Sequence, residues 1–265
     1  MRKLYKMLMF SFSLLFLSSC SIALPSNSTK GLPGEVISSI IVVLIGCILF
    51  LIIGLKAKKT DPLKRPKGIM VLAEWAVEKI DGMVESNMGA RLMGFAPYIM
   101  VIFYYIFACF VIGLLGLPSP MTNLIVPLSI SLVTFVMIHA VSAYYTRWKY
   151  FKRYIDPIPV LLPINLLSMW SPLLSLSFRL FGNGLAGWVI MTIVYGALEG
   201  LSTLLFGSIY WLAPIITPVL HAYFDIFSGF IQTLVFSMLT MLFIAQEVPE
   251  ETLDDSGMLM SKSVK

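Results

Sequence analysis

The chain has 265 residues, of which 58% are hydrophobic and 12% are charged, and its mean hydropathy is +0.89. About a quarter of the residues in an average soluble domain are charged, so one globular core would not bury this much apolar surface. The net charge of +5 does not indicate nucleic-acid binding, because the Lys and Arg residues lie in short clusters between apolar runs. Such clusters set membrane topology. The composition therefore predicts an all-α polytopic membrane protein.

The N-terminal segment resembles a secretory signal. Residues 1–19 have a basic start followed by an apolar run, and the sequence LSSC then places Cys20 after two small residues. This order is typical of a bacterial lipoprotein signal, which would leave a lipidated Cys20 as the first mature residue. The alternative is an uncleaved first helix with its basic end inside. Both interpretations place residues 20–35 outside the membrane.

Apolar runs near the length of a spanning helix, about 20 residues, begin at Val36. The first covers about 36–55 and is followed by a loop that has six cations before Gly68. The second, about 95–115, leads into the cation-free loop GLPSPMTN, and the third, about 125–145, leads into TRWKYFKRYID with four cations. Because positive loops mark the cytoplasmic side, the spans alternate in direction and the N-terminus lies outside.

Residues 69–88 predict a different kind of helix. Apolar side chains recur at helical spacing from Ile69 to Val84, and the opposite face has four carboxylates: Glu74, Glu78, Asp81 and Glu85. This pattern is typical of an amphipathic helix that lies in the membrane interface. A cytoplasmic helix packed on a partner would show the same pattern.

Four prolines interrupt residues 157–172, PIPVLLPINLLSMWSP. Each proline removes a backbone donor. We therefore expect a bent or re-entrant hairpin that enters from the cytoplasmic side, in place of a regular spanning helix.

Two long apolar helices follow, the first over about 173–198 and the second from Pro214 or Pro218 to about 245. Both are longer than the hydrocarbon core is thick, so we expect them to be tilted or kinked. They bring the total to about five transmembrane helices within a membrane domain of residues 36–246. Residues 247–265 form a polar tail, predicted to be cytoplasmic and disordered.

Arg179 is the one charged residue between Pro157 and Leu198. A cation near the bilayer centre costs about 2.5–3.5 kcal/mol on insertion scales, so its presence indicates a function. Small or polar residues share its helix face: Ser175, Gly182, Asn183 and Ala186. Small residues let another helix approach closely, and the arginine's own helix offers no carboxylate before Glu199. The charge is therefore available to a partner.

The last apolar helix has its own polar stripe. Asp225 is the one charged residue from Gly200 to Gln246, and it shares a helix face with His221, Ser228 and Gln232. Because this helix is antiparallel to its neighbour, Gln232 is expected at a depth similar to that of Arg179. A chain of ionisable and hydrogen-bonding groups at such depth suits a proton relay. The alternatives are helix packing by Asp225 and His221, and interhelical hydrogen bonds by Asn183 and Gln232.

Two stretches resemble a known family. SLSFRLFGNGLAG, residues 175–187, is very similar to the arginine-helix motif of the a subunit of F-type ATP synthases. FIQTLVFSMLTMLFI, residues 230–244, is similar to that family's last helix, including its glutamine. The amphipathic helix, the outside N-terminus and the proline-rich segment also agree with the family's layout.

The resemblance implies a stator subunit of the F0 sector in a bacterial plasma membrane. It implies that Arg179 is the essential arginine facing the rotating c-ring between two proton half-channels, with Asn183 and Gln232 lining the same interface. The expected partners are the c-ring subunits, the b subunit of the peripheral stalk, membrane lipid and, indirectly, the F1 sector. The chain has no nucleotide motif, so ATP chemistry belongs to other subunits, and no cofactor, metal or disulfide is implied.

Two positions depart from the family pattern. Nine residues after the arginine, where the family often has Glu or His, this chain has Trp188. Seven residues before the glutamine, where many members have His or Glu, it has Asp225. We therefore expect Asp225, His221 and Glu199 to serve the outer half-channel, although a solvated position at a helix end explains Glu199 equally well. The sequence does not decide between protons and sodium ions.

Two other functions fit the sequence less well. A secondary transporter normally has paired broken helices in two repeated halves, and this sequence shows no internal repeat. A lipoprotein scaffold would account for LSSC but not for an arginine within an apolar helix.

We expect Cys20 to be the mature N-terminal residue and to bear lipid, because a basic start, an apolar run and LSSC occur in that order. Intact-mass analysis of the purified subunit should show a chain that begins at Cys20 with added acyl mass. Substitution of Cys20→Ala should remove the acyl mass. A mass that retains Met1 in the unaltered protein would contradict the lipoprotein signal and leave the topology of residues 36–246 unaffected.

Overall fold

The computed structural model describes residues 34–59, 68–146, 162–207 and 213–248. These ranges are helical apart from short turns, and they contain no strand. Five of their helices are long and apolar enough to cross a membrane, as the composition predicts. The signal segment with Cys20, residues 60–67 of the first basic loop, residues 147–161 and residues 249–265 lie outside the described ranges, while Lys56, Lys58 and Lys59 belong to the end of the first described helix.

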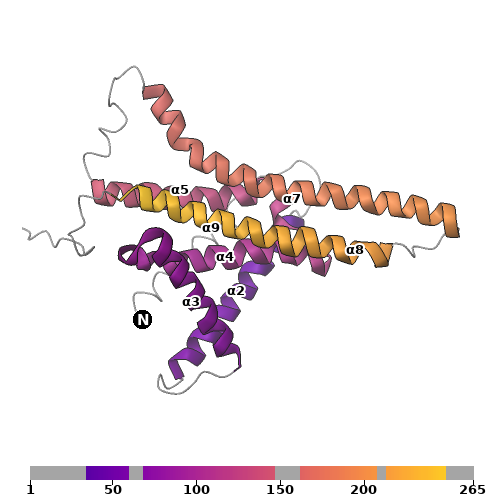
Figure 1. The fold of residues 1–265 in the computed structure, drawn as a ribbon, viewed down its shortest axis with the longest axis horizontal. Helices are drawn as coiled ribbons and strands as arrows, with labels where there is room; N and C mark the ends of the chain where they lie inside the picture. The colour runs from indigo at the N-terminus through magenta and orange to yellow at the C-terminus, as the bar shows by residue number, and fades with distance from the viewer. Residues whose placement is uncertain (1–33, 60–67, 147–161, 208–212, 249–265) are drawn as a thin grey trace, which may run out of the picture.

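The elements follow one another as a helical chain (Figure 1). In order they are α2 (Gly34–Lys59), α3 (Ile69–Met88), the 3-10 helix η1 (Ala90–Phe95), α4 (Ala96–Val111), the 3-10 helices η2 (Ile112–Leu115) and η3 (Pro120–Thr122), α5 (Ile125–Thr146), α7 (Leu162–Phe206), α8 (Ala213–His221), the π-helix η5 (Ala222–Ser228) and α9 (Gly229–Gln246). The three spans predicted before residue 146 correspond to α2, to α4 with its flanking 3-10 helices, and to α5.

Helix α3 has the bounds predicted for the amphipathic helix. Its second half packs on the bundle, because Ile80, Val84 and Met88 are buried against the other helices. Its first half does not, since Leu72 and Trp75 are 67% and 59% exposed. The apolar face of α3 is thus divided between its own chain and the surroundings, as suits a helix at the edge of a membrane domain.

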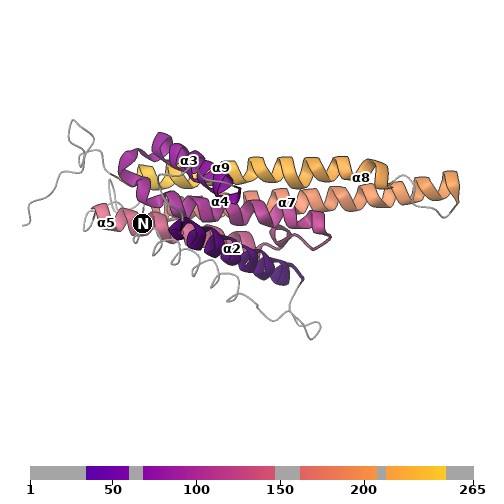
Figure 2. The same cartoon turned by 90° about the horizontal axis from the view of Figure 1, so that it is seen from below.

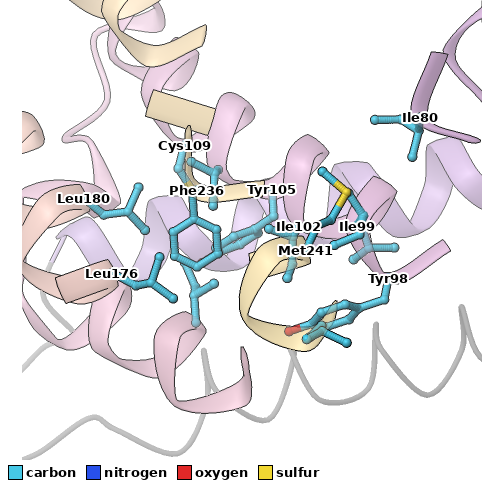
Figure 3. Close-up of a cluster of buried hydrophobic side chains, with 14 of the residues drawn as sticks. Ile80, Tyr98, Ile99, Ile102, Tyr105, Cys109, Leu176, Leu180, Phe236 and Met241 are labelled. Carbon is cyan, nitrogen blue, oxygen red and sulfur yellow. The ribbon is translucent and has the colours of Figure 1, made fainter. Parts of the chain in front are cut away.

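Helix α4 forms the centre of the bundle. Its residues Ile99, Ile102 and Ile106 are almost fully buried. Phe236 and Met241 of α9 pack in the same apolar cluster, as do Leu176 and Leu180 of α7 (Figure 3). Helix α9 therefore packs directly on α4, whereas α7 is held by its buried face mainly against α5 and η3.

Hydrogen bonds between helices reinforce this packing. The Ser39 and Tyr105 hydroxyls, on α2 and α4, lie 2.6 Å apart. The Tyr98 and Thr134 hydroxyls, on α4 and α5, lie 3.0 Å apart. In lipid there is little hydrophobic drive between helices, so such bonds and close packing hold a bundle together.

The hairpin predicted over residues 157–172 is wrong from Leu162 onward. Residues 162–206 form α7, one helix of 45 residues. Pro163 is its second residue, where a backbone N–H has no partner within the helix. Pro172 lies inside the helix and removes one backbone hydrogen bond. Figure 1 shows α7 bent over its first part, which holds Pro172. The prolines thus bend the helix without breaking it, and residues 157–161 lie outside the described ranges.

The last span is continuous from α8 through η5 to α9 and starts at Ala213, close to the predicted Pro214. Helices α7 and α8–α9 lie side by side in both views and extend past α4 and α5 at one end (Figures 1 and 2). The π-helical geometry of residues 222–228, in which hydrogen bonds join residues five apart, differs from the α-helix that the spacing predicts.

Two glycines allow close approach of elements. A β-carbon at Gly184 of α7 would lie 2.8 Å from Cβ and 2.9 Å from the backbone oxygen of Met121 in η3. A β-carbon at Gly229 of α9 would lie 2.6 Å from Cβ of Phe110 in α4. By contrast, Gly182 has no atom within 4 Å of such a position. One face of α7 is therefore tightly packed, while the face two residues away is open.

We expect Gly184→Ala to destabilise the subunit by about 1–3 kcal/mol, as overpacking of a filled site does, because the backbone of Met121 would have to move. The matched control is Gly182→Ala, which fits open space and exchanges glycine for a better helix former. Thermal unfolding of the purified subunit in detergent measures both. Equal stability of the two variants would contradict the packing of α7 on η3.

Candidate functional site

Arg179 lies at the edge of the open face of α7. The three small residues predicted to share its face, Ser175, Gly182 and Ala186, are exposed, while Arg179 itself is half-buried. The opposite side of the helix is buried through Leu176, Leu180 and Gly184. Within the described ranges the Arg179 guanidinium makes no hydrogen bond or ion pair. Among the described residues, the structure thus presents an unpaired cation beside a strip of small side chains.

A hydrogen bond joins α7 to α9 one turn from this arginine. The Asn183 side-chain amide donates to Oε1 of Gln232 at 2.5 Å. Gln232 is 4% exposed, and its Nε2 is buried with no hydrogen-bond partner among the described residues. The structure thus shows the interhelical hydrogen bond that the alternative interpretation of these two residues predicts. It pairs Gln232 with Asn183 and not with Arg179.

His221 and Asp225 form a second polar group. Nδ1 of His221, at the end of α8, lies 2.6 Å from Oδ2 of Asp225 in η5. Both side chains remain partly exposed, at 27% and 22%. A β-carbon on Gly113 of η2 would lie 3.6 Å from the same carboxylate oxygen. The Asp225 side chain therefore extends from the π-helix toward the end of the second span.

Tyr195 of α7 completes this group, and the sequence analysis did not identify it. Its hydroxyl lies 2.8 Å from Nε2 of His221, so three side chains are joined in series across two helices. The helix register contains the signal for this contact. Tyr195 lies twelve residues after Asn183, and His221 lies eleven residues before Gln232. In antiparallel helices that meet at Asn183 and Gln232, these positions are opposite each other.

The remaining predicted residues are Glu199 and Ser228. Glu199 is exposed on α7, four residues past Tyr195. The expectation that its helix ends there is wrong, because α7 continues to Phe206. Ser228 is half-buried at the end of the π-helix. Its spacing and that of Gln232 from Asp225 are therefore not those of an α-helix, and the predicted stripe is interrupted after Asp225.

Trp188 occupies the position at which the resemblance implies Glu or His. Its side chain is 59% exposed on α7, and its carbonyl accepts a hydrogen bond from Thr192. An indole ring donates only through its N–H and does not titrate. The titratable groups at this end of α7 are therefore Tyr195 and Glu199.

Comparison with known proteins identifies the family. The model of the family described as ATP synthase A chain matches residues 36–245. The chain belongs to this family. Subunit a of ATP synthase is a proton-translocating component of the F0 sector, so the chain works in a complex with other ATP synthase subunits. The five apolar helices agree with a multi-pass membrane protein.

Curated relatives cover most of the chain. ATP synthase subunit a of Mycoplasma genitalium is 33% identical over 224 residues, which are 78% of this chain and 76% of the relative. The same subunit of Mycoplasma pneumoniae is 34% identical over 230 residues, or 79% and 77% of the two chains. That of Anoxybacillus flavithermus is 28% identical over 229 residues, or 81% and 93%.

Proposed function

We propose that this subunit a is the stator of the F0 sector, with Arg179 facing the ion-binding carboxylates of the c-ring between two offset half-channels. The observation that carries the proposal is the half-buried guanidinium of Arg179, which makes no ion pair within the described ranges, beside exposed Ser175, Gly182 and Ala186. A cation in an apolar span is stable only beside groups that compensate its charge. A carboxylate carried by a neighbouring rotor is such a group.

The chemistry of arginine suits this role. A fixed cation within about 4–6 Å of a carboxylate favours the ionised form, so a ring carboxylate arriving beside Arg179 would release its proton. Arginine does not itself deprotonate in proteins. It therefore separates the two half-channels without conducting protons between them. Lysine is a compact charge that loses its proton more readily when buried.

The hydrogen bond from Asn183 to Gln232 holds α7 against α9 next to the site. It joins α7 to α9 one helical turn from Arg179, and the packing of Leu180 and Gly184 fixes the rotation of α7 about its axis. The packing of Leu180 and Gly184 lies on the buried side of α7, and the hydrogen bond of Asn183 lies beside the open face. Arg179 and the strip of small residues therefore stay on the open side.

Polar side chains on either side of Gln232 are candidates for the two half-channels. Asp225 and His221 lie toward the end of the last span that follows the outer loop, so they serve the outer half-channel. On the other side of Gln232, Ser237 Oγ and Thr240 Oγ1 of α9 are buried without a hydrogen-bond partner among the described residues. Buried polar atoms of this kind are commonly satisfied by ordered water, which suits the inner half-channel.

The proposed topology follows from the charged loops. The loops rich in Lys and Arg place residues 56–67 and 147–153 in the cytoplasm. The N-terminus, with a lipidated Cys20, then lies outside the plasma membrane of a bacterium, and residues 247–265 lie in the cytoplasm. The partners are the c-ring, the b subunit of the peripheral stalk and, through it, the F1 sector.

We expect Asp225→Asn to slow proton pumping by at least about tenfold with the complex still assembled, because a missing proton-transfer group typically costs 10²–10⁴-fold when the transfer limits the rate. Asp225→Glu, which keeps the carboxylate, should be milder. The comparison variant is Glu199→Gln. Normal pumping by Asp225→Asn together with loss of pumping in Glu199→Gln would move the outer half-channel to Glu199.

We expect Arg179→Ala to abolish both ATP synthesis and ATP-driven pumping, because the ring carboxylate is no longer discharged at the stator. Passive proton leak through F0 should persist or rise, since the cation that separates the half-channels is absent. Arg179→Lys should also fail to couple. Proton pumping and leak are measured in inverted vesicles, with assembly checked by immunoblot.

The matched control for Arg179 is Arg91, which lies in η1, outside the open face, with its guanidinium 5.0 Å from the centre of the Tyr145 ring. Arg91→Lys removes a guanidinium from the same subunit and should leave coupling intact. Coupled pumping at the normal rate by an assembled Arg179→Ala complex would refute the stator function.

A further inference from the structure

We propose that Tyr195 is a positioning residue of the outer half-channel and that it acts through His221. The inference rests on the proposed function of Asp225. Its basis is a series of two hydrogen-bonded contacts, from the Tyr195 hydroxyl to Nε2 of His221 at 2.8 Å and from Nδ1 of His221 to Oδ2 of Asp225 at 2.6 Å.

When Asp225 is ionised, its carboxylate sets the direction of these hydrogen bonds. A carboxylate only accepts hydrogen bonds, so Nδ1 of His221 must carry the proton that it shares with Asp225. In neutral histidine the other nitrogen, Nε2, is then an acceptor. The Tyr195 hydroxyl donates to it. Tyr195 therefore holds His221 in the one neutral tautomer that donates to Asp225.

Protonation of His221 reverses one of these bonds and breaks none. When the ring gains a proton, Nε2 becomes a donor, and the Tyr195 oxygen accepts from it because a phenol hydroxyl both donates and accepts. The imidazolium then donates to Asp225 and to Tyr195 at once. Hydrogen bonds to a charged group are stronger than those between neutral groups. Tyr195 thus favours the protonated ring over the neutral ring.

The position of Tyr195 is related to that of Trp188, where this chain departs from the family pattern. Tyr195 lies seven residues after Trp188 on α7, which is two helical turns and about 10 Å along the same helix face. The titratable hydroxyl that α7 contributes to these contacts therefore lies closer to the outer end of the helix than Trp188 does. It contacts the last span at His221. The hydrogen bonds among Tyr195, His221 and Asp225 thus take the place of the acid–base pair that the family pattern implies at the level of Trp188.

Among the described residues, few other charged groups lie near His221. Glu199 follows Tyr195 by one turn on α7, and Asp225 follows His221 on its own span. The segment nearest Asp225 on the second span, Ile112–Leu115, has no titratable side chain. The hydroxyl of Tyr223, in the π-helix, makes no hydrogen bond among the described residues, although its ring packs on Phe224 and Phe227. Tyr223 is therefore the matched control for Tyr195.

The test is the pH profile of ATP synthesis by the intact complex in liposomes. The F1 sector faces outward, so the pH inside the liposome is the pH at the outer half-channel. The internal pH is varied over the range in which histidine titrates, about pH 5 to 8, while a potassium diffusion potential keeps the total driving force constant. Initial rates are normalised to assembled complex.

We expect Tyr195→Phe to shift the midpoint of this profile by about half a pH unit or more toward acid, because the protonated ring loses the stronger bond. At the midpoint of the unaltered enzyme the rate should fall about twofold or more. Tyr223→Phe should keep the unaltered profile. In a His221→Asn background, Tyr195→Phe should cause no further shift, since its effect passes through His221.

Two results would overturn the inference. One is an unaltered pH profile in Tyr195→Phe. The other is an equal loss of rate from Tyr195→Phe with and without His221, which would show a purely structural effect. Either result in an enzyme that Asp225→Asn slows as expected leaves the proposed function in place. Normal rates in Asp225→Asn, by contrast, would remove the outer half-channel on which the inference rests.

Discussion

The hydrogen bond between Asn183 and Gln232 joins the two longest spans, and the geometry of the site depends on it. In lipid an unsatisfied polar group costs free energy that no solvent compensates, so two amides at this depth hold α7 and α9 in one register. That register places Tyr195 opposite His221. It also turns Arg179 and its small neighbours away from the bundle. One partly buried contact between helices thus supports the two regions that the proposed mechanism requires.

The helices have different roles, and these also follow from the need to satisfy polar groups in lipid. Helix α4 is buried among the others and joins α2 and α5 through Tyr105 and Tyr98. Because these hydrogen bonds and the apolar cluster stabilise the bundle, α7 contributes to the core with one face and leaves the other open. A helix needed on both faces for folding could not present a free surface to a moving partner.

The sequence predicted the spans well because length and hydropathy are properties of single helices. The run from Ile125 to Tyr145 and the amphipathic repeat from Ile69 are both found as helices. The hairpin predicted from the prolines before residue 173 is wrong, because a proline in a long helix costs one hydrogen bond and a bend, which the rest of α7 tolerates. The π-helix around Asp225 and the contact of Tyr195 depend on how two helices meet. Periodicity within one helix does not contain that information.

The strip formed by Ser175, Gly182 and Ala186 has a mechanical consequence. Helices normally interlock, because ridges of side chains on one fit into grooves on the other. Interlocked surfaces would hold a rotor in discrete positions and resist its movement between them. A strip without large side chains presents almost no ridge along its line, so in the proposed assembly the stator surface beside Arg179 acts as a bearing. Attraction between charges, and not shape, then determines where the rotor pauses.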